Sequence, residues 1–158
     1  MLFQVPNFLL KQIRLLIVCY LLMIPLKNTS IILFDGFCNL CNTSVQFVLK
    51  HDTKKHFLLA SLQSDAATKI LLQLNKKSFK KFDSIVLIEN EQLYFKSTAA
   101  LKIAKNLGGF IKLLYVFIIV PTQIRDYIYD FIAKNRYKWF GKKDKCMIPD
   151  KKISNRFL

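Results

Sequence analysis

The sequence is poor in glycine and proline, with four of each among 158 residues. Flexible linkers are rich in such residues, so their scarcity argues against an extended chain of several domains. Hydrophobic residues make up 53% and aromatic residues 13%, which is more than a disordered chain carries. Length and composition together predict one compact domain with a single hydrophobic core.

Acidic residues are scarce as well, since 10 Asp and Glu face 25 Lys and Arg, for a net charge of +15. Such a charge attracts nucleic acid, anionic lipid or acidic protein surfaces. Only four of the basic residues are arginine, the residue that base and phosphate recognition favours, and the lysines are scattered. We therefore expect a solvated basic surface and no specific nucleic-acid site, with a charge selected for a polyanion as the alternative.

Cysteine is too sparse for a disulfide-stapled scaffold, with Cys19, Cys38, Cys41 and Cys146 as the full set. Two of them lie three residues apart, and the other two are remote in sequence. This distribution fits one reactive pair and two further cysteines.

The N-terminal segment, residues 1–30, is set apart from a domain expected over 31–158. Lys11 and Arg14 precede an apolar run over 15–26 that is shorter than the roughly 20 residues of a membrane span. Three interpretations remain open: a translation start at Met23, a membrane anchor or uncleaved signal within 8–26, and a packed helix. The first favours a cytoplasmic protein, and the second a membrane-associated one.

Four short runs have the apolar pattern of strands, at 31–34, 57–60, 84–89 and 92–96. The last two flank a tight turn at Asn90, which indicates a hairpin. Helical spacing follows at 39–50, after an N-cap at Ser64 as far as Leu74, and after a cap at Ser97 as far as Leu107. The apolar run 110–120 contains Lys112 and predicts a core helix, and Pro121 opens a final helix that ends near Gly141.

The predicted order is therefore β-α-β-α-β-β-α with additional C-terminal helices. A crossover helix makes the first two strands parallel, and the hairpin makes the last two antiparallel. This is the element order of a thioredoxin-like α/β fold with about four strands.

Cys38 and Cys41 form a C-x-x-C at the point where the first strand gives way to a helix. The unpaired N–H groups and positive dipole end of a first helical turn stabilise a thiolate, which is the reactive form of cysteine. A spacing of three places both sulfurs on one side of that turn. We expect Cys38 at the exposed helix tip as the attacking nucleophile and Cys41 one turn deeper as the resolving thiol.

Asp35 stands three residues before Cys38, at the end of the strand. It is placed to accept or return a proton for Cys41, and the alternative is a turn-forming or helix-capping role. Two other interpretations of the cysteine pair stay open. A zinc site would need ligands from Cys146 and His51 or His56, without a second C-x-x-C, and a structural disulfide would close only a very small loop.

Several segments resemble one known family. Residues 34–42, Phe-Asp-Gly-Phe-Cys-Asn-Leu-Cys-Asn, are similar to the signature of the DCC family of predicted thiol–disulfide oxidoreductases, which are named for an Asp-Cys-Cys motif. The similarity covers roughly 31–158 and continues through the segments 60–64, 83–87, 96–100, 136–141, Cys146 with Pro149, and 156–158.

The resemblance implies a thioredoxin-like fold and disulfide reductase or oxidase activity, with Asp35, Cys38 and Cys41 as the matching signature residues. Two departures from ordinary thioredoxins stand out. Asn39-Leu40 replaces Gly-Pro between the cysteines, so a redox potential does not carry over. No proline precedes the third strand at Asp83-Ser84, so the cis-proline of a thioredoxin groove has no counterpart.

Cys146 has two interpretations: an auxiliary thiol that receives the disulfide from the pair, or a structural cysteine of the basic C-terminal tail. Arg125, Arg136 and Arg156 either steer an acidic partner or, as we expect, pair with local acids or cap a helix C-terminus.

The sequence thus predicts a thiol–disulfide oxidoreductase of the protein-disulfide reductase type. Its expected partners are a protein or small-molecule thiol or disulfide and an upstream reductant, with no cofactor and no metal. The alternative is a basic thioredoxin-like binding module at a membrane or polyanion, in which redox chemistry is secondary. In that case membrane association would come from the N-terminal segment.

Overall fold

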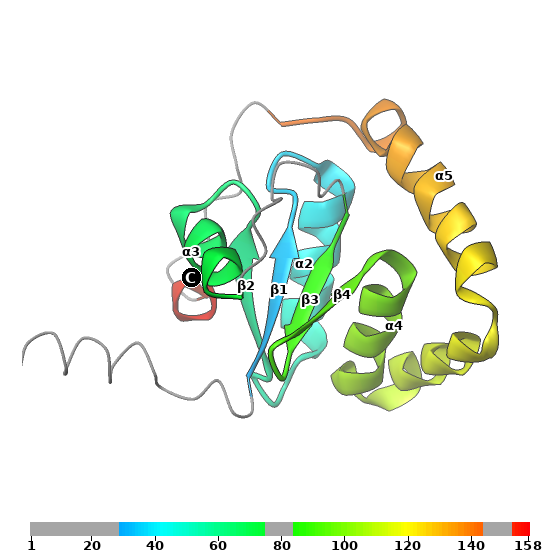
Figure 1. Cartoon of the computed structure of the whole chain (residues 1–158), viewed down its shortest axis with the longest axis horizontal. Helices are drawn as coiled ribbons and strands as arrows, with labels where there is room; N and C mark the ends of the chain where they lie inside the picture. The colour runs from blue at the N-terminus through cyan, green and yellow to red at the C-terminus, as the bar shows by residue number, and fades with distance from the viewer. Residues whose placement is uncertain (1–28, 75–83, 144–152) are drawn as a thin grey trace, which may run out of the picture.

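The computed structural model describes residues 29–74, 84–143 and 153–158, and the N-terminal segment and Cys146 lie outside these ranges. Its core is a four-stranded sheet in the order β2-β1-β3-β4, as Figure 1 shows. The strands are β1 (Ser30–Phe34), β2 (Phe57–Ser61), β3 (Val86–Glu89) and β4 (Gln92–Phe95). β1 pairs parallel with β2 and antiparallel with β3, and β3 pairs antiparallel with β4. The predicted mixed α/β sheet is confirmed.

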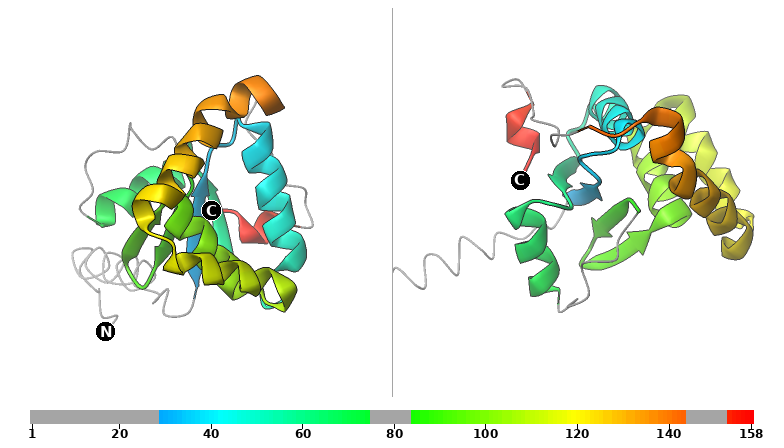
Figure 2. Two further views of the ribbon diagram at one scale, coloured as in Figure 1. Left: turned by 90° about the vertical axis from the view of Figure 1, so that its right-hand side faces the viewer. Right: turned by 90° about the horizontal axis from the view of Figure 1, so that it is seen from above.

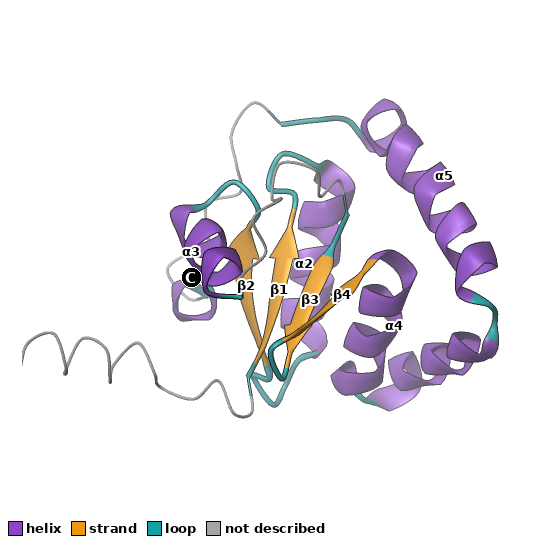
Figure 3. Cartoon of the chain, viewed as in Figure 1, coloured by secondary structure: helices purple, strands orange, loops and turns teal. Residues whose placement is uncertain are grey.

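The helices are α2 (Asn39–His51), α3 (Asp65–Gln73), α4 (Lys96–Leu107) and α5 (Thr122–Phe140), with two 3₁₀ helices, η2 (Gly109–Ile119) and η3 (Ser154–Arg156). The two faces of the sheet are covered by different helices, with α3 on one side and α2 and α4 on the other (Figures 2 and 3). η2 and α5 form an arm at the outer edge of the molecule, beyond α4.

The alternation of β1 explains this layering. Successive side chains of a strand point to opposite faces, so Ile31 and Leu33 pack with Ala67 and Leu71 of α3. On the other face Ile32 and Phe34 join a cluster that contains Val45 and Val48 of α2 and Ile103 of α4. β1 is buried along its whole length, which is why its sequence is a continuous apolar run.

Local signals fix several element ends. Ser64 caps α3 by accepting the N–H of Ala67 at 3.2 Å, as its position predicts. Asn90 and Glu91 both have positive φ angles, 51° and 63°, in the two-residue turn of the β3–β4 hairpin. Gly108 ends α4 with a φ of 73°.

The expected cap at Ser97 is wrong. Phe95 is the N-cap of α4 and makes no side-chain capping bond, while the Ser97 hydroxyl donates to Asp126 of α5. The Ser97 hydroxyl therefore bonds with a residue of another helix and not with a backbone N–H at the start of α4.

The expectation of a core helix over 110–120 is also wrong. The run forms η2, none of whose residues is buried. α2 and α4 already cover this face of the sheet, so η2 packs along α4 at the margin of the core. α5 begins directly after Pro121 and ends before Gly141, as predicted.

Candidate functional site

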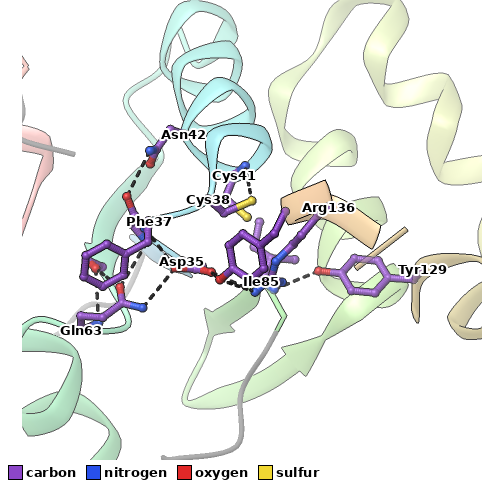
Figure 4. Close-up of polar contacts among 12 residues, drawn as sticks. Asp35, Phe37, Cys38, Cys41, Asn42, Gln63, Ile85, Tyr129 and Arg136 are labelled. Carbon is purple, nitrogen blue, oxygen red and sulfur yellow. Dashed lines mark hydrogen bonds and ion pairs between the residues drawn. The ribbon is translucent and has the colours of Figure 1, made fainter. Parts of the chain in front are cut away.

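The cysteine pair lies where β1 ends and α2 begins (Figure 4). Cys38 is the N-cap of α2, with extended backbone angles, and its sulfur accepts the N–H of Cys41 at 3.4 Å. A sulfur thus takes the place of the oxygen that usually satisfies a free donor of the first turn. Both cysteines are present as thiols.

The exposures of the two cysteines are the reverse of the expected ones. Cys38 has an exposed fraction of 0%, whereas Cys41 is only partly buried. The expectation of an exposed Cys38 is wrong: the residue is buried, and a segment far away in the sequence pairs with its backbone.

This segment, which we call the strap, consists of residues 140–143 at the end of α5. Lys142 forms an antiparallel bridge with Cys38, and the N–H of Lys143 donates to the carbonyl of Phe37 at 2.8 Å. The Asn39 side chain donates to the carbonyl of Phe140 at 2.8 Å. The ammonium of Lys142 also lies 5.8 Å from the centre of the Phe37 ring. The strap thereby ties α5 to the loop that carries Cys38.

The environment of Cys41 favours its protonated form. Burial, the hydrogen bond with the Cys38 side chain and the charge of Cys38 together raise the pKa of Cys41 from 9.0 to about 12. Arg136 acts in the opposite direction and lowers this pKa, while the carboxylate of Asp35 raises it. Cys41 therefore keeps its proton at neutral pH.

Asp35 is buried below the pair and accepts from four donors. Its Oδ1 accepts the N–H of Phe37 at 3.0 Å and the side-chain amide of Gln63 at 3.2 Å. Its Oδ2 accepts from the guanidinium of Arg136 at 2.9 Å and from the hydroxyl of Tyr137. Of the two structural roles weighed for Asp35, the turn is present and the helix cap is not, since Cys38 is the N-cap.

Arg136 and Tyr137 are site residues that the sequence did not single out as such. The side chains of Arg136 and Asp35 form an ion pair with exposed fractions of only 5% and 7%. Their positions differ by 101 in the sequence, so no local spacing relates them. The one available signal was that Arg136 and Tyr137 open the segment 136–141, which belongs to the family resemblance.

The three arginines pair within the chain, but the acids that Arg136 and Arg156 bind are 101 and 104 positions away in the sequence and not local. Arg136 binds Asp35, Arg156 binds Asp52 and the carbonyl of Phe57, and Arg125 donates to the carbonyl of Val120.

A groove of about 600 Å³ lies between α5 and the body of the domain and reaches Cys41. Its polar end contains Cys41, Asp35, Arg136 and Tyr129, and most of its remaining wall is apolar, including Ile103, Leu107 and Ile132. The Tyr129 hydroxyl accepts the N–H of Ile85 at 3.0 Å, just before β3. This volume is typical of a small-molecule site.

Within 29–74, 84–143 and 153–158, no cluster of three or more His, Cys, Asp or Glu could hold a metal ion. Cys146, a possible auxiliary thiol or a structural cysteine, lies outside these ranges.

Residues 32–142 match the family model of the DCC1-like thiol-disulfide oxidoreductases. The chain is 48% identical to the uncharacterized protein YuxK of Bacillus subtilis (strain 168), over 81% of this chain and 93% of that protein. It is 42% identical to a chloroplastic DCC family protein of Arabidopsis thaliana, over 73% of this chain and 67% of that protein. No solved structure matches the chain.

Proposed function

Because the chain belongs to the DCC1-like thiol-disulfide oxidoreductase family, we propose that it reduces disulfides by exchange through Cys38 and Cys41. The observation that carries this proposal is the inequality of the two thiols at the start of α2. Cys38 receives a backbone N–H and stands at the positive end of the helix, while the Cys41 thiol keeps its proton. Cys38 is therefore the nucleophile and Cys41 the resolving thiol.

The reaction has two exchange steps. The Cys38 thiolate attacks one sulfur of the substrate disulfide, which gives a mixed disulfide and releases the other substrate sulfur as a thiolate that takes up a proton. Cys41 then loses its proton and attacks the Cys38 sulfur, so that the second substrate thiol leaves and Cys38–Cys41 becomes a disulfide. Two electrons pass from the dithiol to the substrate.

Access to Cys38 requires the strap to move. The strap is held by a few hydrogen bonds at the surface, so its displacement breaks few contacts. Gly141, whose φ is 80°, is the residue at which the chain leaves α5. The groove offers a substrate its approach, because it already leads to Cys41 beside the covered sulfur.

Asp35 and Arg136 adjust the second step. Arg136 lowers the pKa of Cys41 and Asp35 raises it, so the buried pair sets how readily Cys41 gives up its proton. Asp35 also holds Arg136 in place, which makes it a positioning residue as well as the nearby carboxylate for the proton of Cys41.

An upstream thiol reductant reopens the Cys38–Cys41 disulfide and completes the cycle. The cytoplasm supplies such reductants through its thioredoxin and glutathione systems, and we place the activity there. The reaction needs neither a metal nor an organic cofactor.

The test uses serine variants of the full-length protein in the reduction of insulin disulfides and of glutathione disulfide by dithiothreitol. Cys38→Ser is expected to lose exchange activity while keeping its circular dichroism spectrum. Cys41→Ser is expected to accumulate mixed disulfides with its partners, which mass spectrometry of non-reduced samples identifies. Cys19→Ser is the matched control and should keep full activity, whereas a loss in Cys146→Ser would assign Cys146 the auxiliary role. Unchanged turnover in Cys38→Ser would refute the mechanism.

A further inference from the structure

The arm made of η2 and α5 exposes large apolar side chains that the redox site does not use. In a 3₁₀ helix, side chains three residues apart lie above one another. Phe110, Leu113, Val116 and Ile119 therefore form one stripe along η2, and each is more than half exposed. The two ends of the stripe, Phe110 and Ile119, are 91% and 82% exposed.

A second stripe follows on α5. Ile124, Tyr127, Ile128 and Phe131 recur at the spacing of one face of an α-helix, and all four are more than half exposed. We call the eight residues of the two stripes the docking face. Contiguous exposed apolar surface of this kind marks an interaction site.

The remaining sides of η2 and α5 face the body of the domain. Asp126 and Asp130 of α5 bond with Ser97 and Lys96, and Tyr129, on the same side of the helix, bonds with Ile85. On η2, Ile111 packs against the core. The docking face therefore lies on the sides of η2 and α5 that are turned away from the body of the domain.

The charges near the docking face are of one sign. Lys134 and Lys138 continue the stripe of α5, three and seven residues after Phe131, and both are exposed. Lys112 is exposed on η2. Both acidic residues of α5 are engaged on its inner side, so no carboxylate borders the apolar stripe of that helix.

We propose that the docking face binds the surface of an anionic lipid bilayer. Apolar and aromatic side chains that enter the headgroup region, with lysines beside them, are the pattern of helices that lie in a membrane interface. The net charge of +15 adds long-range attraction to anionic headgroups. Among the described residues no helix is long and apolar enough to cross a membrane.

The experiment measures flotation of the full chain with vesicles of phosphatidylcholine alone and of phosphatidylcholine mixed with phosphatidylglycerol. The wild type is expected to float with the anionic vesicles. Phe110→Ser combined with Ile119→Ser should weaken this partitioning about tenfold or more, because two large apolar side chains no longer enter the interface. Lys134→Gln combined with Lys138→Gln should weaken binding to the anionic vesicles in a salt-dependent manner.

The matched control is Leu72→Ser on α3, which removes an apolar side chain that is also more than half exposed but lies outside the docking face. It should float like the wild type, and the double serine variant should reduce glutathione disulfide at the wild-type rate.

Equal flotation of wild type and double variant would overturn the proposal, since the N-terminal segment would then be the anchor. A dimer in light scattering that the double variant turns into a monomer without vesicle binding would overturn it in favour of a second copy of the chain. Either result leaves the thiol chemistry of Cys38 and Cys41 untouched.

Discussion

At the scale of single residues, the surroundings of the cysteine pair include a buried ion pair as well as the start of a helix. Asp35 and Arg136 lie below Cys41, and each alters its pKa in an opposite direction. The sequence motif contains only the aspartate of this pair. The arginine comes from α5, and its position next to the motif is a result of the tertiary fold.

Replacing Asp35 by Asn should destabilise the protein by about 3–5 kcal/mol, because the guanidinium of Arg136 would stay buried without its counter-charge. Urea denaturation followed by circular dichroism measures this change. Asp130→Asn is the control, since its ion pair with Lys96 is partly exposed and should cost at most about 1 kcal/mol. Equal losses in the two variants would contradict a special role for the buried pair.

The raised pKa of Cys41 predicts a pH dependence of stability. Below pH 9 the thiol is protonated in both the native and the unfolded chain, and between pH 9 and about 12 only the unfolded chain ionises. The free energy of unfolding of the reduced protein should therefore fall as the pH rises through this window. Other groups titrate there too, so the quantity to compare is the difference between wild type and Cys41→Ser. If both lose stability equally with pH, Cys41 is not the group responsible.

At the scale of elements, the strap is the feature that most changes the expected site. It joins the end of α5 to the loop before α2 through Phe37, Cys38 and Asn39. Cys38, the proposed nucleophile, is therefore buried at the N-terminus of α2, with the strap paired to its backbone.

Gly141→Ala should loosen the strap and expose Cys38. Gly141 has a φ of 80°, which is unfavourable for alanine, and a Cβ at this position would lie 3.1 Å from Nδ2 of the Asn39 side chain. We expect iodoacetamide to label Cys38 up to about tenfold faster, as measured by peptide mass spectrometry. Gly108→Ala is the control, because Gly108 has a similar φ of 73° but nothing within 4 Å of its Cβ position. Equal labelling of both variants would assign the effect to general strain.

Elements with a strong local pattern were predicted well from the sequence. β1 is fully buried and reads as an apolar run, and α3 has a cap that its own sequence supplies. Two predictions failed because contacts between distant segments replaced local ones. The Ser97 hydroxyl bonds with Asp126 of α5 instead of capping α4. None of the residues of η2 is buried, because α2 and α4 already cover that face of the sheet. Composition cannot show which of several apolar segments reaches the core.

At the scale of the whole molecule, the two ends of the described domain are joined through the sheet. Arg156 of η3 binds the buried carboxylate of Asp52 and the carbonyl of Phe57, and the N–H of Leu158 donates to the carbonyl of Leu59. The C-terminal residues thereby extend the edge of the sheet at β2.

Arg156→Met should lower the free energy of unfolding by about 3–5 kcal/mol, because Asp52 would remain buried as an unpaired charge. Urea denaturation tests this. Arg156→Met combined with Asp52→Asn should recover part of the loss, because the amide carries no charge and its single oxygen can still accept one of the two N–H groups, of His56 and Phe57, that bond with the two oxygens of Asp52. A double variant as unstable as the single one would show that packing by Arg156, and not charge, matters.

The strap also has a consequence for how the protein is made. Asn39 and Phe140, which it joins, are 101 positions apart, so the ribosome completes the dithiol long before it adds the residues that shield it. A nascent chain, or one cut short before Gly141, presents Cys38 without its cover to every oxidant and electrophile around it. The contacts between the strap and the segment around Cys38 can thus form only after translation has passed residue 143.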